Sequence, residues 1–299
     1  MRHMNVIKRD ARIDLRQLLS EKACLRVLEA HSPISAMLAK SVRLGAGDTS
    51  LGYDAIWSSS LTDSTQRCLP DIEILSPSDR LERLNEILAV CDLPLIYDAD
   101  TGGKIEHFAI HVQWLARAGV SAIVIEDKCG LKKNSLLGLS VHQEQETVEH
   151  FCDKIRVGTH HRLGGSMMIF ARCESLILEK GLDDALARCR AYTQAGADGI
   201  MIHSRKSTGE EILEFARRFK QTHPHTPLVC VPTSYPQLTF SCLADAGFNA
   251  VIYANHMLRG AYSAMRQVAT SILEHDRAYE IEPACMPIDE ILSLVPGTR

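Results

Sequence analysis

The sequence lacks the long apolar runs that mark secreted and membrane-spanning chains. Its start, residues 1–10, lacks the apolar stretch of a signal peptide, and no later run approaches the roughly 20 apolar residues that span a bilayer. We therefore expect a cytoplasmic protein with no membrane partner.

A strong charge of either sign is also missing. The 299 residues carry a formal net charge of -4, so there is no electrostatic reason to expect nucleic acid or an anionic membrane surface as a partner. With 45% hydrophobic and 23% charged residues, the composition is that of an ordinary globular protein. An anionic small molecule must therefore be held by a local cluster of cations.

Paired cysteines and a glycine-rich nucleotide signature are absent too. The ten cysteines are scattered from Cys24 to Cys285 with no C-x-x-C pair, which argues against structural zinc and against a redox motif. We interpret them as mostly buried free thiols. No G-x-G-x-x-G follows the first apolar run, so a dinucleotide-binding fold is disfavoured.

What the sequence does contain is a regular alternation of short apolar runs with amphipathic segments. Eight runs have the length and character of buried strands, and they cover residues 25–30, 54–58, 93–97, 121–125, 167–171, 199–202, 228–231 and 250–253. Apolar residues at helical spacing predict helices over residues 15–23, 33–44, 78–88, 107–118, 142–157, 182–195, 210–221, a short stretch ending at 246, and 258–274. Residues 61–70 are polar and predict irregular structure.

Eight strand-then-helix units define the expected architecture. Strands buried on both faces and separated by helices favour a parallel sheet, and eight units predict an α/β fold of the closed (β/α)8 TIM-barrel type. Three helix-to-strand joints carry Ala-Gly, at 118–119, 195–196 and 246–247, where glycine can end a helix in the left-handed conformation. We expect one domain over residues 1–299, with an N-terminal helix and a C-terminal tail at 275–299. An open doubly wound sheet is the alternative.

Polar side chains follow the predicted strands, at the point where each strand ends. In a barrel the carboxyl ends of the strands meet on one face, so these side chains should converge there. They are Asp98, Asp100, Glu126, Asp127, Arg172, Glu174, His203, Thr233 and Asn255. Any one of them is as readily a helix cap or a loop charge, but the set favours a site. For His31, core packing and a place in the pocket are equal alternatives.

Three of these carboxylates suggest a metal ion. Asp98, Asp100 and Glu126 would lie close together, and like-charge repulsion is costly unless a cation intervenes. Oxygen ligands without a nearby cysteine or histidine pair favour magnesium or manganese over zinc. The alternative is that Lys128 or Arg172 neutralises the carboxylates.

Two further features suit an anionic substrate. Arg172 and His203 follow neighbouring strands and are able to hold an anion against the metal. A basic loop, Lys132-Lys133-Asn134-Ser135, lies between the fourth strand and the next helix. Loops over a barrel mouth commonly act as lids, although a basic loop is otherwise most often only solvated.

At these residues the chain resembles a known family. Glu126-Asp127-Lys128 with Asn134-Ser135 is similar to the E-D-K-x-x-x-x-x-N-S signature of phosphoenolpyruvate mutases, in the isocitrate lyase superfamily. The likeness extends over most of the chain, through Leu28-Glu-Ala-His31, Trp57-Ser-Ser-Ser-Leu61, Asp98-Ala-Asp-Thr-Gly102, Ala171-Arg-Cys-Glu174, His203-Ser204, Val231-Pro-Thr233 and Ala254-Asn-His256. As a set these segments are highly specific.

The resemblance implies a magnesium-dependent enzyme that interconverts phosphoenolpyruvate and phosphonopyruvate, which makes the carbon–phosphorus bond at the start of phosphonate biosynthesis. The family's equilibrium favours phosphoenolpyruvate, so a second enzyme would consume phosphonopyruvate. The family is usually homotetrameric and exchanges C-terminal helices between neighbouring subunits. The tail from 275 to 299 is compatible with this assembly.

The resemblance also implies roles for single residues. Asp98 matches a direct metal ligand, and its water-mediated shell matches Asp71, Asp100 and Glu126. Contacts with the pyruvyl part of the substrate are implied for Trp57, Ser59, Ser60 and Leu61. The residues expected to take part in catalysis are Asp71, Arg172 and His203, together with Lys132, Asn134 and Ser135 of the gating loop. Asp71 is the nucleophile if a phosphoenzyme forms, but we favour direct transfer.

Two features depart from the family pattern. Position 60 is Ser where the mutases carry Gly, which places an extra hydroxyl where backbone amides should approach the substrate carboxylate, and residues 45–52 form an unfamiliar insertion. Both bear on substrate details more than on fold.

Three other functions remain to be weighed. Phosphonopyruvate hydrolase shares nearly everything except the loop asparagine and is the closest alternative. Carbon–carbon lyases of the superfamily carry K-[KR]-C-G-H where this chain has Lys132-Lys133-Asn134-Ser135, so the thiol that serves as their acid or base is absent. A non-catalytic metabolite-binding barrel would need a metal site that has lost its ligands, yet every position of that site still carries an acidic residue.

Overall fold

The computed structural model describes residues 13–45 and 50–298, which contain a closed barrel of eight parallel strands. Around the barrel the strands follow the order β1, β10, β9, β8, β7, β4, β3, β2. Their bounds are Leu25–Glu29 (β1), Ala55–Ser58 (β2), Leu95–Asp98 (β3), Ala122–Glu126 (β4), Met168–Cys173 (β7), Gly199–Ile202 (β8), Leu228–Cys230 (β9) and Ala250–Tyr253 (β10). The predicted (β/α)8 barrel is confirmed, and an open doubly wound sheet is excluded.

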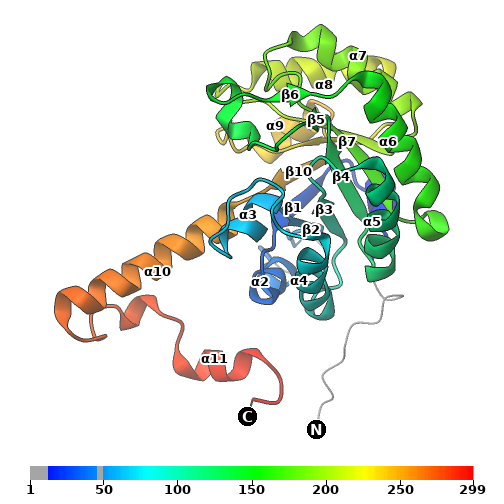
Figure 1. The fold of residues 1–299 in the computed structure, drawn as a ribbon. Helices are drawn as coiled ribbons and strands as arrows, with labels where there is room; N and C mark the ends of the chain where they lie inside the picture. The colour runs from blue at the N-terminus through cyan, green and yellow to red at the C-terminus, as the bar shows by residue number, and fades with distance from the viewer. Residues whose placement is uncertain (1–12, 46–49, 299) are drawn as a thin grey trace.

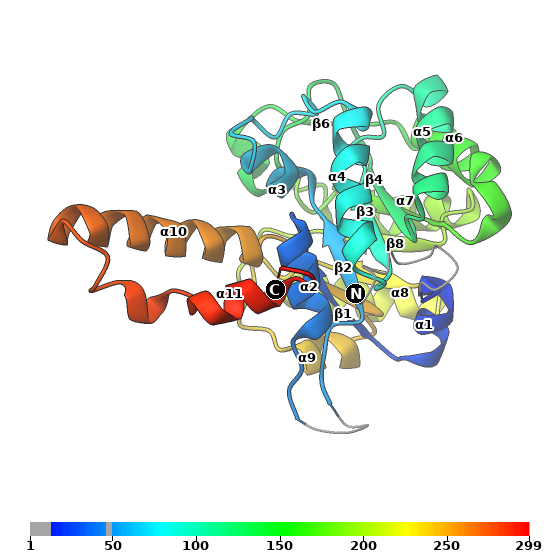
Figure 2. The ribbon, with the colours of Figure 1, turned by 90° about the horizontal axis from the view of Figure 1, so that it is seen from below.

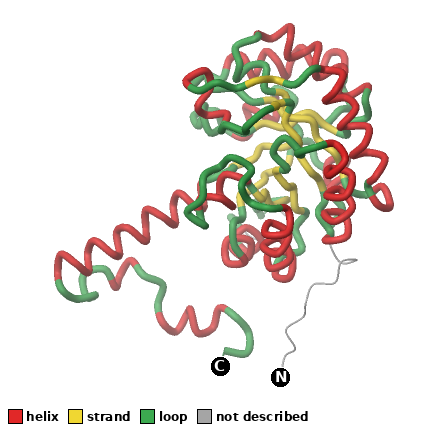
Figure 3. The backbone as a smooth tube through the Cα atoms, viewed as in Figure 1, coloured by secondary structure: helices red, strands yellow, loops and turns green. Residues whose placement is uncertain are grey.

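Helices surround the barrel, as Figures 1 and 3 show. They are α1 (Leu15–Glu21), α2 (Pro33–Ser41), α3 (Ser60–Thr65), α4 (Pro77–Val90), α5 (Ile105–Ala118), α6 (Val148–His161), α7 (Gly181–Gln194), α8 (Glu210–Thr222) and α9 (Phe240–Asp245). Short 3-10 helices cover Ser135–Ser140 (η3), Leu163–Gly165 (η4) and Glu282–Ala284 (η5). A small antiparallel pair, β5 (Lys128–Cys129) with β6 (Glu144–Gln145), lies in the connection after β4.

Alternating side chains along each strand build two apolar layers. The inner layer fills the barrel and contains Val27, Trp57, Ile96, Val124, Phe170, Met201, Val229 and Ile252, with Leu15 of α1 packed against it. The outer layer, between strands and helices, includes Ile56, Ile123, Ile169, Ile200, Phe215 and Phe219. Because the strands are buried on both faces, polar side chains are confined to the strand ends.

The predicted helix ends are correct at the three Ala-Gly joints. Gly119, Gly196 and Gly247 have φ values of 91°, 105° and 104°, in the left-handed region that glycine adopts easily. The unfamiliar insertion is described only at its edges, where Leu44 and Leu51 form an isolated antiparallel bridge. Residues 46–49, like residues 1–12, lie outside the described part of the chain.

Three local predictions were wrong. Residues 61–70 are not all irregular but contain most of α3, because Asp63 pairs with the distant Arg80 at 3.0 Å and stabilises this polar helix. The helix predicted at 142–157 begins only at 148, because residues 144–145 instead pair as β6 with β5. Helix α4 is capped by Ser76, in a capping box with Asp79, and not by Ser78.

The last long helix extends away from the barrel. α10 (His256–His275) leaves the barrel as a straight arm, and α11 (Ile288–Leu294) turns back below it in the view of Figure 1, with a second view in Figure 2. No residue of α10 is buried, and Tyr262, Met265 and Leu273 are exposed. In the described ranges, no helix combines the length and apolar character needed to cross a bilayer.

Candidate active site

A small cavity of about 70 Å³ opens at the carboxyl ends of the barrel strands. Among the residues predicted from sequence, its lining includes Trp57, Ser59, Ser60, Leu61, Asp71, Asp98, Lys132, Asn134, Ser135, Arg172, His203, Thr233 and Asn255. Asp100, Glu126 and Glu174 are not part of the lining, but each contacts a cation that is. Asp100 pairs with Lys132, while Glu126 and Glu174 pair with Arg172. The strand ends and the loop after β4 therefore meet at one place.

A buried arginine that the sequence analysis missed fixes one side of this cavity. Arg80, which is 4% exposed, donates from Nε to Asp63 Oδ2 at 3.0 Å and from Nη1 to the carbonyl of Asp98 at 2.5 Å. Its guanidinium lies 4.1 Å from the centre of the Tyr97 ring, and Ser58 Oγ donates to Asp63 at 3.2 Å. Arg80 thus holds α3 against the end of β3. An arginine in an amphipathic helix usually faces solvent, so the sequence did not indicate that Arg80 is buried.

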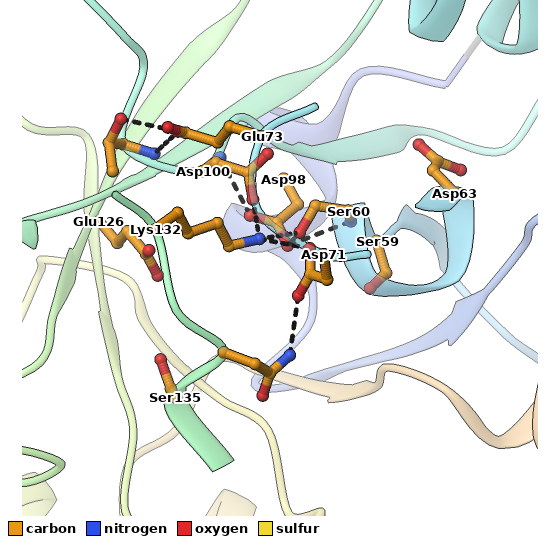
Figure 4. A network of polar contacts seen from close by, with 12 residues as sticks. Ser59, Ser60, Asp63, Asp71, Glu73, Asp98, Asp100, Glu126, Lys132 and Ser135 are labelled. Atoms are coloured by element: carbon orange, nitrogen blue, oxygen red, sulfur yellow. Dashed lines mark hydrogen bonds and ion pairs between the residues drawn. The ribbon is translucent and has the colours of Figure 1, made fainter. Parts of the chain in front are cut away.

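The Lys132 ammonium occupies the centre of the carboxylate group, as Figure 4 shows. It donates to Asp71 Oδ1 at 2.6 Å, to Asp100 Oδ1, and to Ser60 Oγ at 2.8 Å, so all three of its protons have acceptors. Burial would lower the pKa of Lys132, but Asp100 and Asp98 raise it above its ordinary value. The side chain therefore stays charged at this buried position.

The two aspartates at the end of β3 have different pKa values. Burial raises the pKa of Asp100 to about 6, although Lys132 acts in the opposite direction. Asp98 is buried as well, but Lys132, Arg172 and Arg80 hold its pKa below the usual value. Asp98 is therefore the carboxylate more readily available in its charged form.

Glu126 ends β4 beside a second group of ion pairs. Its oxygens lie 3.2 Å from Lys128 Nζ and 3.0 Å from Arg172 Nη2, yet neither accepts an aligned hydrogen bond from the part of the chain that the structure describes. Burial raises the pKa of Glu126 to about 7, partly offset by Arg172 and Lys128. The sequence left open whether Lys128 or Arg172 neutralises the carboxylates. Both cations pair with Glu126, whereas Asp100 pairs with Lys132.

Lys128 fastens the loop that covers the cavity. Its Nζ donates to the carbonyl of Lys133 at 2.7 Å, to Ser135 Oγ at 2.9 Å and to Gln143 Oε1 at 3.1 Å. Two of these acceptors lie in the first half of the loop, which covers residues 130–143 between β5 and β6, and the third lies at its last residue. One buried lysine, together with the pairing of β5 with β6, thus holds the loop in the conformation observed.

Asn134 and Ser135 point from this loop toward the cavity. Asn134 Nδ2 donates to Asp71 Oδ2 at 2.8 Å, while its Oδ1 accepts from the Leu136 amide at 3.0 Å, which fixes the orientation of the carboxamide. Ser135 Oγ accepts from Arg172 Nη2 at 2.6 Å. Ser135 Oγ also accepts from Lys128 and donates to Glu174 Oε2, so its hydroxyl is fully engaged within the protein. The loop therefore presents the amide of Asn134 to whatever the cavity binds.

The opposite wall of the cavity is formed by His203, Thr233 and Asn255. His203 Nδ1 lies 3.3 Å from Glu174 Oε1, and its buried Nε2 has no hydrogen-bond partner in the described part of the chain. Burial and, to a smaller extent, the nearby Arg172 lower the pKa of His203, so a neutral imidazole is favoured near neutral pH. Asn255 Nδ2 lies 3.5 Å from Thr233 Oγ1. This wall offers polar groups without a fixed charge.

Two predicted candidates lie elsewhere. Asp127 does not converge with the strand-end set, because it follows Glu126 directly and adjacent residues along a strand point to opposite faces. It is fully buried and accepts from Tyr192 Oη at 2.6 Å. His31 neither packs in the core nor lines the cavity; its Nδ1 pairs with Glu29 Oε1 at 2.7 Å.

The side chains around Asp98 suit a hydrated divalent cation. Within residues 13–45 and 50–298, no three His, Cys, Asp or Glu side chains form a ready metal centre, and Lys132 takes the central position instead. The acidic residues here offer only oxygen ligands, and the two buried oxygens of Glu126 accept no aligned hydrogen bond from a described residue. Because Mg²⁺ keeps several water ligands, Asp98 with Asp71, Asp100 and Glu126 around it fits such an ion.

Comparison with known proteins shows the family of this chain. The family model described as phosphoenolpyruvate phosphomutase matches residues 15–273. The chain is 37% identical over 289 residues to the phosphonopyruvate hydrolase of Variovorax sp. (strain Pal2), covering 95% of this chain and 94% of that protein.

Two solved structures agree with this result. The crystal structure of the phosphoenolpyruvate phosphomutase of Streptomyces platensis subsp. rosaceus superimposes with a TM-score of 0.87 at 34% identity, over 94% of this chain and 93% of that one. A structure of phosphonopyruvate hydrolase in complex with oxalate and Mg²⁺ gives a TM-score of 0.83 at 35% identity, over 96% and 94%. The chain therefore belongs to the phosphoenolpyruvate phosphomutase family, within the isocitrate lyase/phosphoenolpyruvate mutase superfamily of enzymes.

Proposed function

We propose that the protein is a phosphoenolpyruvate mutase, an isomerase that interconverts phosphoenolpyruvate and phosphonopyruvate with Mg²⁺, or Mn²⁺ in its place, as cofactor. The family model and the structural match to a phosphoenolpyruvate phosphomutase support this activity. So does a cavity that combines a carboxylate group with Arg172 and His203. Its product with a carbon–phosphorus bond would enter phosphonate biosynthesis.

The observation that carries the proposal is the position of Asn134. Its Nδ2 is directed at Asp71 in the cavity, and its Oδ1 is already engaged by the loop backbone. An amide donor at this place is suited to bind the oxygens of a phosphoryl group in transit and to fill the space that an attacking water would need. Transfer to the methylene carbon would then be faster than hydrolysis.

The other lining residues take roles that their contacts support. Trp57 and the Ser59–Leu61 segment would bind the pyruvyl part, while Arg172 and His203 would contact its charged groups. Bound Mg²⁺ would neutralise charge on the phosphoryl oxygens, since phosphoryl transfer is loose and spreads negative charge. Both oxygens of Asp71 already accept hydrogen bonds, from Lys132 and Asn134, which makes it a weak nucleophile and favours direct transfer.

Phosphonopyruvate hydrolysis is the second candidate, because the Variovorax hydrolase is 37% identical over almost the whole chain. A lyase that cleaves carbon–carbon bonds has less support. No cysteine belongs to the residues that line the cavity, and Cys129, in β5, has its Sγ 3.9 Å from Glu144 instead. A metabolite-binding barrel without activity has the least support, because the acidic positions are all occupied.

Phosphorus NMR of the purified protein with phosphonopyruvate and Mg²⁺ tests the assignment. Conversion to phosphoenolpyruvate is expected, whereas inorganic phosphate and pyruvate as main products would replace the mutase by the hydrolase. Asn134→Thr should lower mutase turnover by about tenfold or more, equivalent to roughly 1.4 kcal/mol of transition-state stabilisation, and admit some hydrolysis. Ser140→Ala, which removes an exposed hydroxyl of the same loop, is the matched control and should keep wild-type turnover.

We further propose a cytoplasmic homotetramer that works beside an enzyme consuming phosphonopyruvate. The assembly would use α10 and residues 275–299, because α10 carries exposed apolar side chains and has no buried residue within this chain. An exposed apolar face of this kind commonly marks a protein interface. Exchange of the C-terminal helices between neighbouring subunits would cover it.

A further inference from the structure

Ser60 makes contacts that link the gating loop to the carboxylate group. Its hydroxyl donates to Asp98 Oδ2 at 3.0 Å and accepts from Lys132 Nζ at 2.8 Å. The Ser60 amide lies 3.3 Å from the same Asp98 oxygen. A glycine at this position, as in the family pattern, would keep the amide contact but lose both contacts of the hydroxyl.

The hydrogen bonds of Lys132 indicate what that loss would do. Lys132 is 4% exposed and its ammonium has three protons, which are accepted by Asp71, Asp100 and Ser60. Without the Ser60 hydroxyl, one N–H of a buried cation would lack this acceptor. A buried charged donor left without a partner is unfavourable, so the lysine would leave the cavity more readily, and its loop with it.

Backbone conformation does not explain the serine. Ser60 is the first residue of α3, and it is not among the residues with positive φ, so glycine has no conformational advantage here. The neighbouring Ser59 is equally buried, at 5% exposure for both residues, but no hydrogen bond joins its hydroxyl to a described residue of the loop. The bridge is therefore specific to Ser60.

We propose that Ser60 is a positioning residue whose hydroxyl bridges Lys132 to Asp98 and holds the gating loop over the cavity before substrate binds. The loop of this protein then has a larger closed population in the ligand-free state than a glycine at position 60 would allow. This inference goes beyond the proposed function, because it concerns the free protein. It applies equally to a mutase and to a hydrolase.

Hydrogen exchange of the ligand-free, metal-free protein, followed by mass spectrometry over loop residues 130–143, tests the proposal. Ser60→Ala, which keeps Cβ and removes the hydroxyl, should speed loop exchange by roughly tenfold, the lower range expected for losing a hydrogen bond to a charged group. Ser60→Gly should do the same. Ser59→Ala should match the wild type, and thermal unfolding confirms that each variant is folded.

Three results would overturn the proposal. The first is unchanged loop exchange in Ser60→Ala, including the case where only Ser60→Gly is faster, which would assign the effect to the backbone. The second is equal acceleration by Ser59→Ala. The third is a full effect of Ser60→Ala in a Lys132→Met background, because the hydroxyl would then act on the loop without the lysine. No substrate or turnover enters the measurement, so its failure is distinguishable from failure of the mutase assignment.

Discussion

Replacing Arg80 by Met should destabilise the protein strongly, although no sequence motif marks this residue. The change removes the guanidinium between Asp63 and the Asp98 carbonyl and keeps an unbranched side chain as long as the aliphatic stem of arginine. Asp63, which is 2% exposed, would retain the Ser58 hydroxyl as a partner but lose its compensating charge. Breaking a buried ion pair in this way costs about 3–5 kcal/mol.

Urea unfolding of the metal-free protein measures this loss of unfolding free energy. All variants are compared at the same protein concentration, because subunit assembly makes the apparent stability depend on it. The double variant Asp63→Asn with Arg80→Met removes the orphaned charge and should recover a substantial part of the lost stability. Mg²⁺ affinity should fall in both variants, because Arg80 also holds the end of β3 that carries Asp98. A loss below about 1 kcal/mol in Arg80→Met, or a double variant no more stable than the single one, would refute this account of the pair.

Three further predictions concern the metal and the assembly. Asp98→Ala should abolish Mg²⁺ binding and activity, because a hydrated ion with one direct carboxylate has little else to hold it; wild-type affinity in a magnesium titration would contradict the assignment. Burial raises the pKa of Asp100 to about 6 and that of Glu126 to about 7, so both take up protons as the pH falls through this range, and Mg²⁺ affinity should fall from pH 8 to pH 6. Calorimetry at pH 6 in two buffers of different ionisation heat should detect proton release on binding, and equal heats would count against these pKa values. Met265→Glu with Leu273→Glu, two exposed positions of α10, should shift light-scattering masses below the tetramer, and an unchanged mass would argue against an interface there.

The barrel was predictable from sequence because each strand is a short apolar run that is buried on both faces. Glycine at the ends of three helices marked the joints equally well. By contrast, α3 depends on a pair between Asp63 and Arg80, 17 positions apart, and β6 depends on pairing with β5. Contacts of this kind leave no trace in local periodicity, so both elements were missed.

The candidate site was predictable in its membership more than in its contacts. Strand ends and the family signature indicated most of the residues that line the cavity. They did not indicate that Lys132 would occupy the centre of the carboxylates, since a loop lysine has no periodic pattern that fixes its direction. Asp127 was predicted to belong to the site but bonds Tyr192 instead, because a position at a strand end does not determine which way a side chain points.

The pairing of β5 with β6 keeps the two ends of the gating loop together, and it lies outside the cavity lining. Most of the entropy of bringing these ends together is therefore lost once, when the chain folds, and not again each time the loop closes. Only residues 130–143 need to be ordered over the substrate. We expect a gating loop with fixed ends to open within microseconds to milliseconds. Release of product would then depend on how tightly Lys128 and Lys132 hold the loop and not on a slow conformational search.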